Sequence, residues 1–325
     1  MKVDESKLGD LPGEREAQKA APESTKTKID PMGLINLLIV YIAYGSTYLA
    51  IRVAVRPGGG FSPYNLGFLR LILAGILLLL WGAIHKKRML PTREEWFVLV
   101  GSGILFWTFA NGLVGWAEMR ADSGLAALVV AFTPIWVAFL ESLIDRRLPS
   151  RLLFFSLLLG FGGIVLLSVP TIQTGVHADF YSILALIGAS CSWGLGSVLQ
   201  SRRKMSLSPD VSSGYQQIVG ALGFIVLMFL VGDTMPEATG EAWLAWGYLV
   251  VVGSILGFTA FTQTLKLLPT SVAMTYAFVN PVIAVILGVI ILGEDTTLWT
   301  FAGACLVLLG VAGVFRDRYG GTASD

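Results

Sequence analysis

The chain has 325 residues, of which 54% are hydrophobic and only 14% are charged, and its formal net charge is +1. This charged fraction is about half that of a soluble domain, and a chain of this length cannot bury so much apolar surface in one core. The composition therefore excludes an ordinary soluble protein and predicts an integral membrane protein. The two cysteines, Cys191 and Cys305, lie in apolar runs and indicate neither a disulfide framework nor a metal site.

The first segment, residues 1–32, is polar and charged and has almost no large apolar side chains. Such a composition predicts a disordered tail. A cleavable signal peptide would place its apolar stretch close to the start, and this chain does not, so we expect none.

Ten stretches after this tail are long and apolar enough to cross a bilayer, which takes about 20 residues in a helix. Short charged or turn-rich segments such as 85–88 and 202–204 separate them, so consecutive helices must run antiparallel. We therefore predict an all-α integral membrane protein of ten transmembrane helices. The predicted spans are residues 33–55, 64–84, 95–116, 122–143, 151–169, 179–199, 211–232, 242–267, 270–291 and 297–315.

The Lys and Arg residues predict the orientation of these spans, because such residues are retained on the cytoplasmic side. If the N-terminus is cytoplasmic, 19 of the 23 lie in cytoplasmic tails and loops. Only Arg52, Arg56 and Arg120 then lie outside, and Arg70 lies within the second span. Both termini are therefore predicted to be cytoplasmic, in a multi-pass plasma membrane protein (the inner membrane of a prokaryote).

The two halves of the chain resemble each other weakly. Residues 122–126 and the following Phe132-Thr133-Pro134 match residues 269–273 and Val279-Asn280-Pro281 at an offset of 147, which also pairs Arg70 with Gln217. We predict a first repeat at 33–170, a second at 179–315 and a short cytoplasmic tail at 316–325. Because each repeat has five spans, an odd number, the second must be inverted. Inverted repeats hold a solute site between them near the midplane.

These residues resemble the EamA family of the drug/metabolite transporter superfamily, most closely its YedA-like exporters. The resemblance covers about residues 33–315 and depends on short motifs in both halves. The first half departs from the family pattern, because Ile144-Asp145-Arg146 stands where a second Leu-Gly-Glu would be expected. The resemblance implies export of amino acids or other metabolites, or import of vitamins and other small molecules. The motifs are Tyr44-Gly45-Ser46-Thr47-Tyr48, Arg70 with Ala74, the Ser/Thr-x-x-Ala stretches before Pro134 and Pro281, Leu292-Gly293-Glu294 and the glycine-rich last span.

Arg70 is the most informative candidate for a site residue. A cation inside a span costs at least ~2.5 kcal/mol unless it faces a polar cavity or a partner. It could line a substrate cavity and bind a carboxylate. It could equally be a structural tie that bonds backbone carbonyls or extends toward the outer interface, which is only ~9 Å away at 1.5 Å per residue.

The third span carries Trp107 and Asn111, four residues apart and so on one helix face, where an amide would lie beside an aromatic wall. Trp116 could be an interfacial anchor. Glu118 could belong to the site or pair with Arg120 in water.

Pro134 and Pro281 recur at equivalent places, where each removes a backbone donor and frees a carbonyl. They could form hinges beside a cavity or simple packing kinks. Thr133 and Asn280 immediately before them could present polar groups to a substrate. The remaining candidates are polar or aromatic residues within spans, some of which would instead bond neighbouring helices. They are Tyr44, Tyr48, Trp193, Gln217, Gln263 and Tyr276.

We interpret the chain as a secondary transporter that exports amino acids or similar metabolites, with its two five-helix halves rocking about a central cavity. An uptake permease or facilitator is the alternative. An enzyme is disfavoured because both histidines, His85 and His177, lie in predicted loops and no phosphate-binding Gly-Lys-Ser/Thr loop occurs. A channel would favour a repeated pore ring built by several subunits, whereas this chain carries an inverted repeat within itself. A non-transporting scaffold would not need Arg70 and the polar groups at membrane depth. We expect no cofactor, metal or nucleic acid, and a monomer or homodimer in a lipid bilayer; coupling to protons is a hypothesis.

Overall fold

The computed structural model describes residues 29–56, 58–121, 123–173, 179–287, 289–290 and 297–320, and every element in them is helical. Ten helical stretches are long and apolar enough to span a membrane, as predicted. Six are single helices in the structure. These are α2 (Pro31–Val55), α3 (Pro63–Ile84), α8 (Arg151–Gln173), α9 (Phe180–Ser201), α10 (Pro209–Val231) and α15 (Leu298–Tyr319).

The other four spans are interrupted, and the interruptions recur in the two halves. The third and eighth spans each contain a π-helical segment, and the fourth and ninth each contain a turn that divides them in two. π-Helical segments are rare and often lie at functional sites. The pieces are α4 (Arg93–Gly103), η2 (Ile104–Asn111) and α5 (Gly112–Glu118); α6 (Ser123–Val130) and α7 (Thr133–Asp145); α11 (Gly240–Tyr248), η3 (Leu249–Gly257) and α12 (Phe258–Leu267); and α13 (Thr270–Ala273) and α14 (Tyr276–Leu287).

The helix ends differ from the predicted ones where caps and charges extend a helix. α2 begins two residues early because the Asp30 side chain accepts hydrogen bonds from the N–H groups of Met32 and Gly33. α15 continues through Tyr319, so part of the predicted C-terminal tail is helical. Most of the predicted disordered tail, residues 1–28, lies outside the described residues, as does the Leu-Gly-Glu motif at 292–294.

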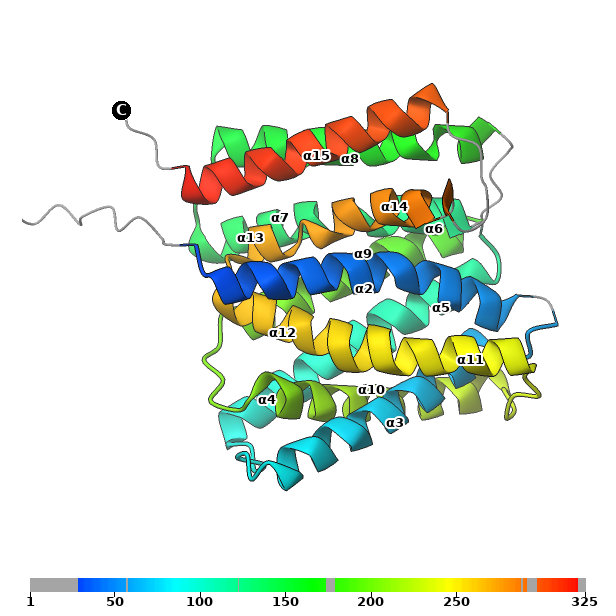
Figure 1. Ribbon diagram of the computed structural model, residues 1–325. Coiled ribbons are helices and arrows are strands. Elements are labelled where there is room, and N and C mark those ends of the chain that lie inside the picture. Colours follow the sequence, from blue (N-terminus) through cyan, green and yellow to red (C-terminus); the bar gives the residue numbers. More distant parts are fainter. Residues whose placement is uncertain are drawn as a thin grey trace, which may run out of the picture.

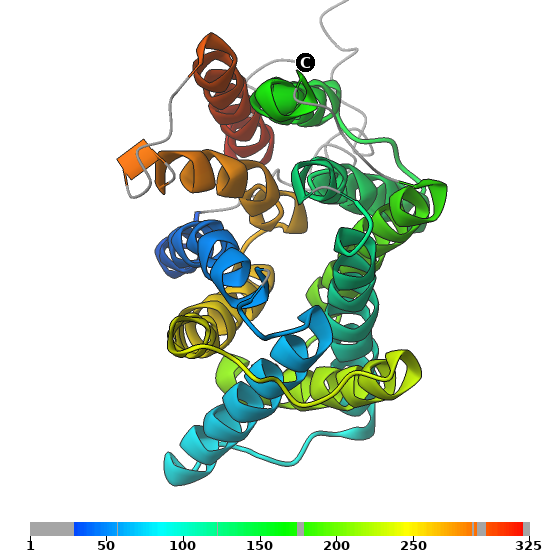
Figure 2. The ribbon, with the colours of Figure 1, turned by 90° about the vertical axis from the view of Figure 1, so that its right-hand side faces the viewer.

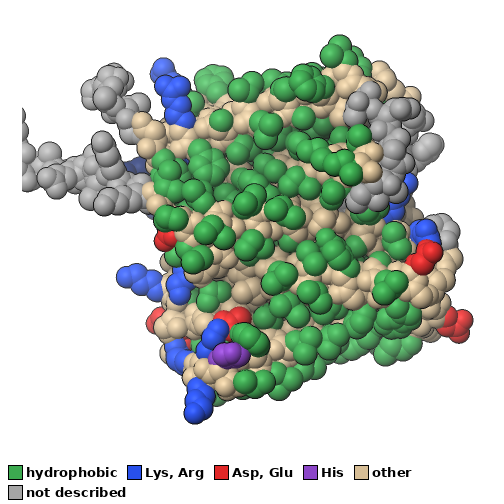
Figure 3. Space-filling model, viewed as in Figure 1, with side chains coloured by type: hydrophobic (Ala, Val, Ile, Leu, Met, Phe, Trp, Pro, Cys, Tyr) green, Lys and Arg blue, Asp and Glu red, His purple; other side chains and the backbone are tan. Residues whose placement is uncertain are grey.

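Apolar side chains cover the outer surface between the two ends of the helices, where Phe229 is 86% exposed and Leu244 is 77% exposed. Figure 3 shows this apolar band, with the charged side chains at its two ends. A soluble protein does not expose so continuous an apolar surface. Together with the ten spans, it fits a multi-pass membrane protein.

Two antiparallel helix pairs form the edges of the molecule. α8 packs along α15 at one edge, and α3 packs along α10 at the other (Figure 1). Glycine allows the first pair its close approach, because a Cβ at Gly163 would lie 2.6 Å from the backbone nitrogen of Val307 and 2.7 Å from the carbonyl oxygen of Gly303. In the second pair, a Cβ at Gly75 would lie 3.1 Å from the carbonyl oxygen of Gly214.

Between these edges, two groups of helices face each other (Figure 2). In the first wall, α2 packs on α11, η3 and α12 and on α14. In the second wall, α9 packs on α4, η2 and α5 and on α6 and α7. Each wall therefore combines helices of both sequence halves, because the first span of each half packs on the third and fourth spans of the other half. The start of α2 and the end of α15 lie at the same end of the walls (Figure 1), which we call the termini side; the opposite end is the far side.

Contacts within the two walls match each other residue by residue. A Cβ at Gly253 would lie 2.9 Å from Cγ2 of Thr47, in the first wall. The equivalent positions, at offsets of 149 and 147 residues, are Gly196 and Phe106 in the second wall, where a Cβ at Gly196 would lie 2.8 Å from Cε1 of Phe106. The duplication seen in the sequence thus recurs in the packing.

Candidate functional site

A cavity of about 220 Å³ lies between the two walls. Its residues come from the far-side half of α2, from α3 and α14, and from the middle and far-side parts of the second wall. It reaches the far side at the exposed Glu118. A smaller cavity of about 90 Å³ adjoins it and shares Arg70, Trp107, Asn111 and Glu118. The lining of the larger cavity is Tyr44, Thr47, Ile51, Arg70, Trp107, Ala110, Asn111, Val114, Glu118, Ala126, Ala127, Val130, Thr133, Ala189, Trp193, Tyr276 and Asn280.

Arg70 extends from α3 into this cavity and has no anionic partner among the described residues. Its Cζ lies 5.1 Å from the centre of the Trp107 ring, a distance at which the ring face attracts a cation. Its Nε is buried and has no hydrogen-bond partner. No hydrogen bond or ion pair joins the guanidinium to a described residue, so the structural tie considered from the sequence is not formed here. An unpaired cation in a cavity is a site for a negatively charged group.

Trp107 and Asn111 are positioned by the π-helical segment η2. The Asn111 Nδ2 donates a hydrogen bond to the carbonyl oxygen of Phe106, five residues earlier, at 2.7 Å. This bond holds the amide within the widened helix. η2 therefore places an indole ring and an amide side chain in the lining of one cavity.

Several buried polar atoms around the cavity have no hydrogen-bond partner. They are the hydroxyl of Tyr44, the indole nitrogens of Trp107 and Trp193, and Oδ1 of Asn280. Buried polar groups are almost always hydrogen-bonded, so each such exception needs an explanation. A bound solute with polar groups would supply the missing partners.

Aromatic rings border the cavity on its inner side. The Trp193 ring lies 4.8 Å from that of Phe106, and the Tyr44 ring lies 5.4 Å from that of Tyr276. These side chains belong to one buried cluster that also contains Phe258 and Phe261. The cavity is thus largely apolar with a few converging polar groups, which is typical of a small-molecule site.

Glu118 ends α5 at the far-side mouth of the cavity and makes no ion pair with a described residue. Arg120, its partner in the alternative interpretation, lies instead over the ring of Trp116, with Cζ 4.4 Å from the ring centre. Among the described residues that line the cavity, Arg70 is the only cation and Glu118 the only carboxylate.

The remaining predicted residues lie in different places. Thr133 lines the cavity, and its hydroxyl donates a hydrogen bond to the carbonyl oxygen of Val130 at 2.6 Å. Pro134 has no N–H to donate to this carbonyl, so the Thr133 hydroxyl takes that place. Pro134 is the second residue of α7, whereas Pro281 lies inside α14.

The two predicted glutamines lie outside the cavity lining. Gln217 is fully buried, and its Nε2 donates to the carbonyl oxygen of Ser254 at 3.2 Å. Gln263 has a buried and unpaired Oε1. The side chain of Tyr48 lies outside the described residues.

Sequence reasoning missed the small and aliphatic part of the lining, such as Thr47, Ala126 and Ala189. Alanines are common throughout membrane helices, so their identity carries no signal. Their contact with a cavity depends on how the helices pack.

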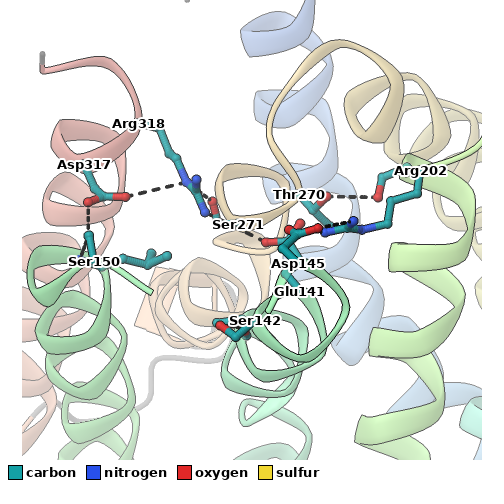
Figure 4. A network of polar contacts seen from close by, with 12 residues as sticks. Glu141, Ser142, Asp145, Ser150, Arg202, Thr270, Ser271, Asp317 and Arg318 are labelled. Atoms are coloured by element: carbon teal, nitrogen blue, oxygen red, sulfur yellow. Dashed lines mark hydrogen bonds and ion pairs between the residues drawn. The ribbon is translucent and has the colours of Figure 1, made fainter. Parts of the chain in front are cut away.

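At the termini side, polar contacts join the ends of α7, α9, α13 and α15 (Figure 4). Arg202, just beyond α9, donates two hydrogen bonds to the Asp145 carboxylate of α7, at 2.5 and 2.6 Å, and these bonds raise the pKa of its guanidinium above the ordinary value. Ser201 and Thr270 join through their hydroxyls at 3.0 Å. A hollow of about 790 Å³ surrounds this network, and Leu265 contributes to it.

The network links α7, α9 and α13 with α15. The Nε of Arg318 donates to the Ser271 hydroxyl at 2.8 Å, and its guanidinium lies 3.9 Å from the Glu141 carboxylate. The acidic residues at the end of α7 therefore belong to a cluster of ion pairs. Among the described residues, no three His, Cys, Asp or Glu side chains gather as a metal site requires.

Comparison with known proteins gives consistent matches along the whole helical region. The model of the EamA-like transporter family matches residues 31–169 and 180–316. The uncharacterized inner membrane transporter YedA of Escherichia coli is 29% identical over 287 residues, which cover 87% of this chain and 90% of YedA. The uncharacterized transporter YdfC of Bacillus subtilis is 26% identical over 82% of this chain and 86% of its own length.

A solved crystal structure matches 86% of this chain and 95% of its own with a TM-score of 0.74. The two sequences are only 17% identical, so this match shows the fold alone.

Proposed function

Because the chain belongs to the EamA-like transporter family, we propose that it exports amino acids or similar small metabolites as a secondary transporter with alternating access. The observation that carries this proposal is the unpaired Arg70 in a largely apolar cavity whose mouth holds Glu118. A substrate carboxylate would bind the guanidinium, and a substrate ammonium would be attracted to the carboxylate or to Oδ1 of Asn111. The apolar and aromatic walls would accept the substrate side chain.

The size of the cavity supports a small substrate. Its volume of about 220 Å³ is below the ~300–1,000 Å³ of sites for drug-sized ligands. A single amino acid or a metabolite of similar size suits such a space better than a peptide or a large drug.

The orientation and direction are part of the proposal. The termini side carries most of the Lys and Arg residues, which supports cytoplasmic termini. The present cavity would then reach the outside, and the Ser201–Thr270 contact, which joins the second wall to the first, would close the cytoplasmic side. A symmetric carrier runs in whichever direction its gradients dictate, so a high cytoplasmic concentration of substrate would drive export.

The moving bodies that we propose are the two walls, and not the two sequence halves that were expected to rock. Each wall interlocks helices of both halves, so the halves cannot separate without breaking the packing of α2 and α9 on their neighbours. Rocking of the walls about the α3–α10 and α8–α15 pairs would close the far side and open the termini side. Proton coupling remains a hypothesis, with Glu118 as the candidate carrier of the proton.

The test is counterflow into liposomes that contain the purified protein and a high internal concentration of unlabelled solute. Labelled amino acids and related metabolites are screened outside, with Arg70→Gln as the test variant and Arg120→Gln as the control, because Arg120 does not line the cavity. We expect saturable accumulation of one solute class, retained in the control and reduced at least tenfold in Arg70→Gln. Equal activity of both variants would refute the role of the cavity, and no accumulation by folded protein across the panel would contradict the proposed substrates.

A further inference from the structure

The structure contains one cavity that reaches the far side, and alternating access requires a second one that reaches the termini side. We propose that Gln217 and Ser254 line this second cavity, where Gln217 takes the place that Arg70 has in the first. This inference rests on the alternating access proposed above, and it adds residues that do not touch the present cavity.

The first support is a contact that both halves share. Arg70 lies against Trp107, and the residues 147 positions later, Gln217 and Ser254, are also in contact, through the hydrogen bond from the Gln217 amide to the Ser254 carbonyl. Both pairs join the second span of a repeat to the π-helical segment of its third. Arg70 lies about two turns from the far-side end of α3, and Gln217 lies about two turns from the termini-side end of α10. The two pairs are therefore inverted equivalents.

Exchange of conformation between two inverted repeats produces the opposite state of a transporter. In that opposite state, the equivalent residue of the other repeat lines the second cavity in place of each residue that lines the present one. Gln217 would replace Arg70, Ser254 would replace Trp107, and Phe258 would replace Asn111.

The second support is that each of these two residues carries a buried polar atom without a partner. Oε1 of Gln217 and Oγ of Ser254 are both buried and have no hydrogen-bond partner. Buried polar atoms without partners are costly, and exposure to water or substrate in another state would explain them.

The third support is the hollow on the termini side. Leu265 lines this hollow. It lies 147 positions after Glu118, which is at the mouth of the present cavity. The hollow thus occupies the position of a mouth, and a path from Leu265 to Gln217 would complete the second cavity. Gln217 and Leu265 are uncharged where the present cavity has Arg70 and Glu118, so a zwitterionic substrate would leave both of these charged partners as it crosses.

The experiment measures which side of the membrane reaches each position. Single cysteines replace Gln217, Arg70 or, as a matched control, Gln216, in full-length protein in which Cys191 and Cys305 are serine. Gln216 is the neighbour of Gln217 and resembles it in being buried, hydrogen-bonded through Nε2 and unpaired at Oε1. Its equivalent 147 positions earlier, Leu69, does not line the present cavity, so Gln216 should stay packed in both states. A membrane-impermeant thiol reagent is applied to vesicles of each orientation, and labelling after denaturation shows that the protein is present.

We expect Gln217→Cys to react from the termini side, Arg70→Cys from the far side, and Gln216→Cys at least tenfold more slowly than either. Labelling is irreversible, so it also accumulates when the second state is a minor one at ~1%. A disulfide between Ser201→Cys and Thr270→Cys, whose hydroxyls lie 3.0 Å apart and join the second wall to the first, should hold the termini side closed. It should slow the labelling of Gln217→Cys at least tenfold and leave that of Arg70→Cys unchanged.

Each result has a distinct meaning. If Gln217→Cys reacts no faster than Gln216→Cys, or if the disulfide does not slow it, the second cavity is refuted while the first stands. If Arg70→Cys cannot be reached from the far side, the proposed function itself fails.

Discussion

Replacement of Arg70 by Met tests whether Arg70 is a substrate-binding residue or a structural tie, because the two roles predict opposite effects on stability. If Arg70 were a structural tie, its removal would break hydrogen bonds and destabilise the protein. The structure shows no hydrogen bond or ion pair from its guanidinium to a described residue, and its Nε is buried and unpaired. We therefore expect Arg70→Met to abolish transport and leave the protein as stable or more stable.

The magnitude follows from two opposing contributions. An Arg within a span costs about 2.5–3.5 kcal/mol on insertion scales. The cation–π contact with the Trp107 ring offsets about 0.5–2 kcal/mol of this cost. The difference predicts that Arg70→Met raises the free energy of unfolding by up to about 3 kcal/mol, and by less where water in the cavity already solvates the charge. Loss of a charged hydrogen bond to a substrate carboxylate, at about 1.5–3 kcal/mol, would weaken binding roughly 10- to 150-fold.

The assay compares thermal unfolding of wild type and Arg70→Met in the same detergent, alongside counterflow in liposomes. Arg70→Lys is the matched control, since it keeps the charge and loses the planar, bidentate geometry, and should retain part of the activity. A melting temperature for Arg70→Met that falls by about 5 °C or more would refute the reasoning and restore the structural interpretation.

Two further predictions concern the mouth of the cavity and the packing of an edge. Glu118→Gln should abolish the response of substrate efflux to an imposed pH gradient. The control Glu241→Gln alters a far-side carboxylate that pairs with Arg56 outside the cavity, and it should keep the response. An unchanged response in Glu118→Gln would contradict the role of Glu118 in proton coupling. Gly163→Ala places a Cβ 2.6 Å from backbone of α15 and should destabilise the protein by about 1–3 kcal/mol in thermal unfolding, whereas Gly162→Ala has open space and should be neutral. Equal melting temperatures for these two variants would show that α8 and α15 separate freely.

The spans could be predicted from the sequence because the bilayer imposes a length of about 20 apolar residues. Helix ends were less certain, since caps such as Asp30 and charged ends such as Arg316 extend a helix past its apolar part. The repeat was visible because polar and proline residues recur at one offset. The exchange of helices between the walls was not, since sequence halves do not reveal which helices pack together.

Candidate site residues could be predicted where a charged, polar or large aromatic side chain stands within an apolar span. Arg70, Asn111 and Trp107 stand out within an apolar span, and the structure brings them to one cavity. Gln217 stands out equally in the sequence, yet it is packed against η3. Which of two equivalent polar residues faces the cavity depends on the conformational state, and a sequence encodes both states at once.

Exchange across the membrane tests the proposed carrier mechanism most directly. Liposomes are loaded with the labelled substrate found by counterflow, and its efflux is measured with and without unlabelled substrate outside. A carrier with alternating access should release the label several-fold faster when substrate is present on the other side, because the loaded carrier returns faster than the empty one. Efflux that is unchanged by external substrate, and that does not saturate with internal concentration, would contradict the carrier and indicate a channel.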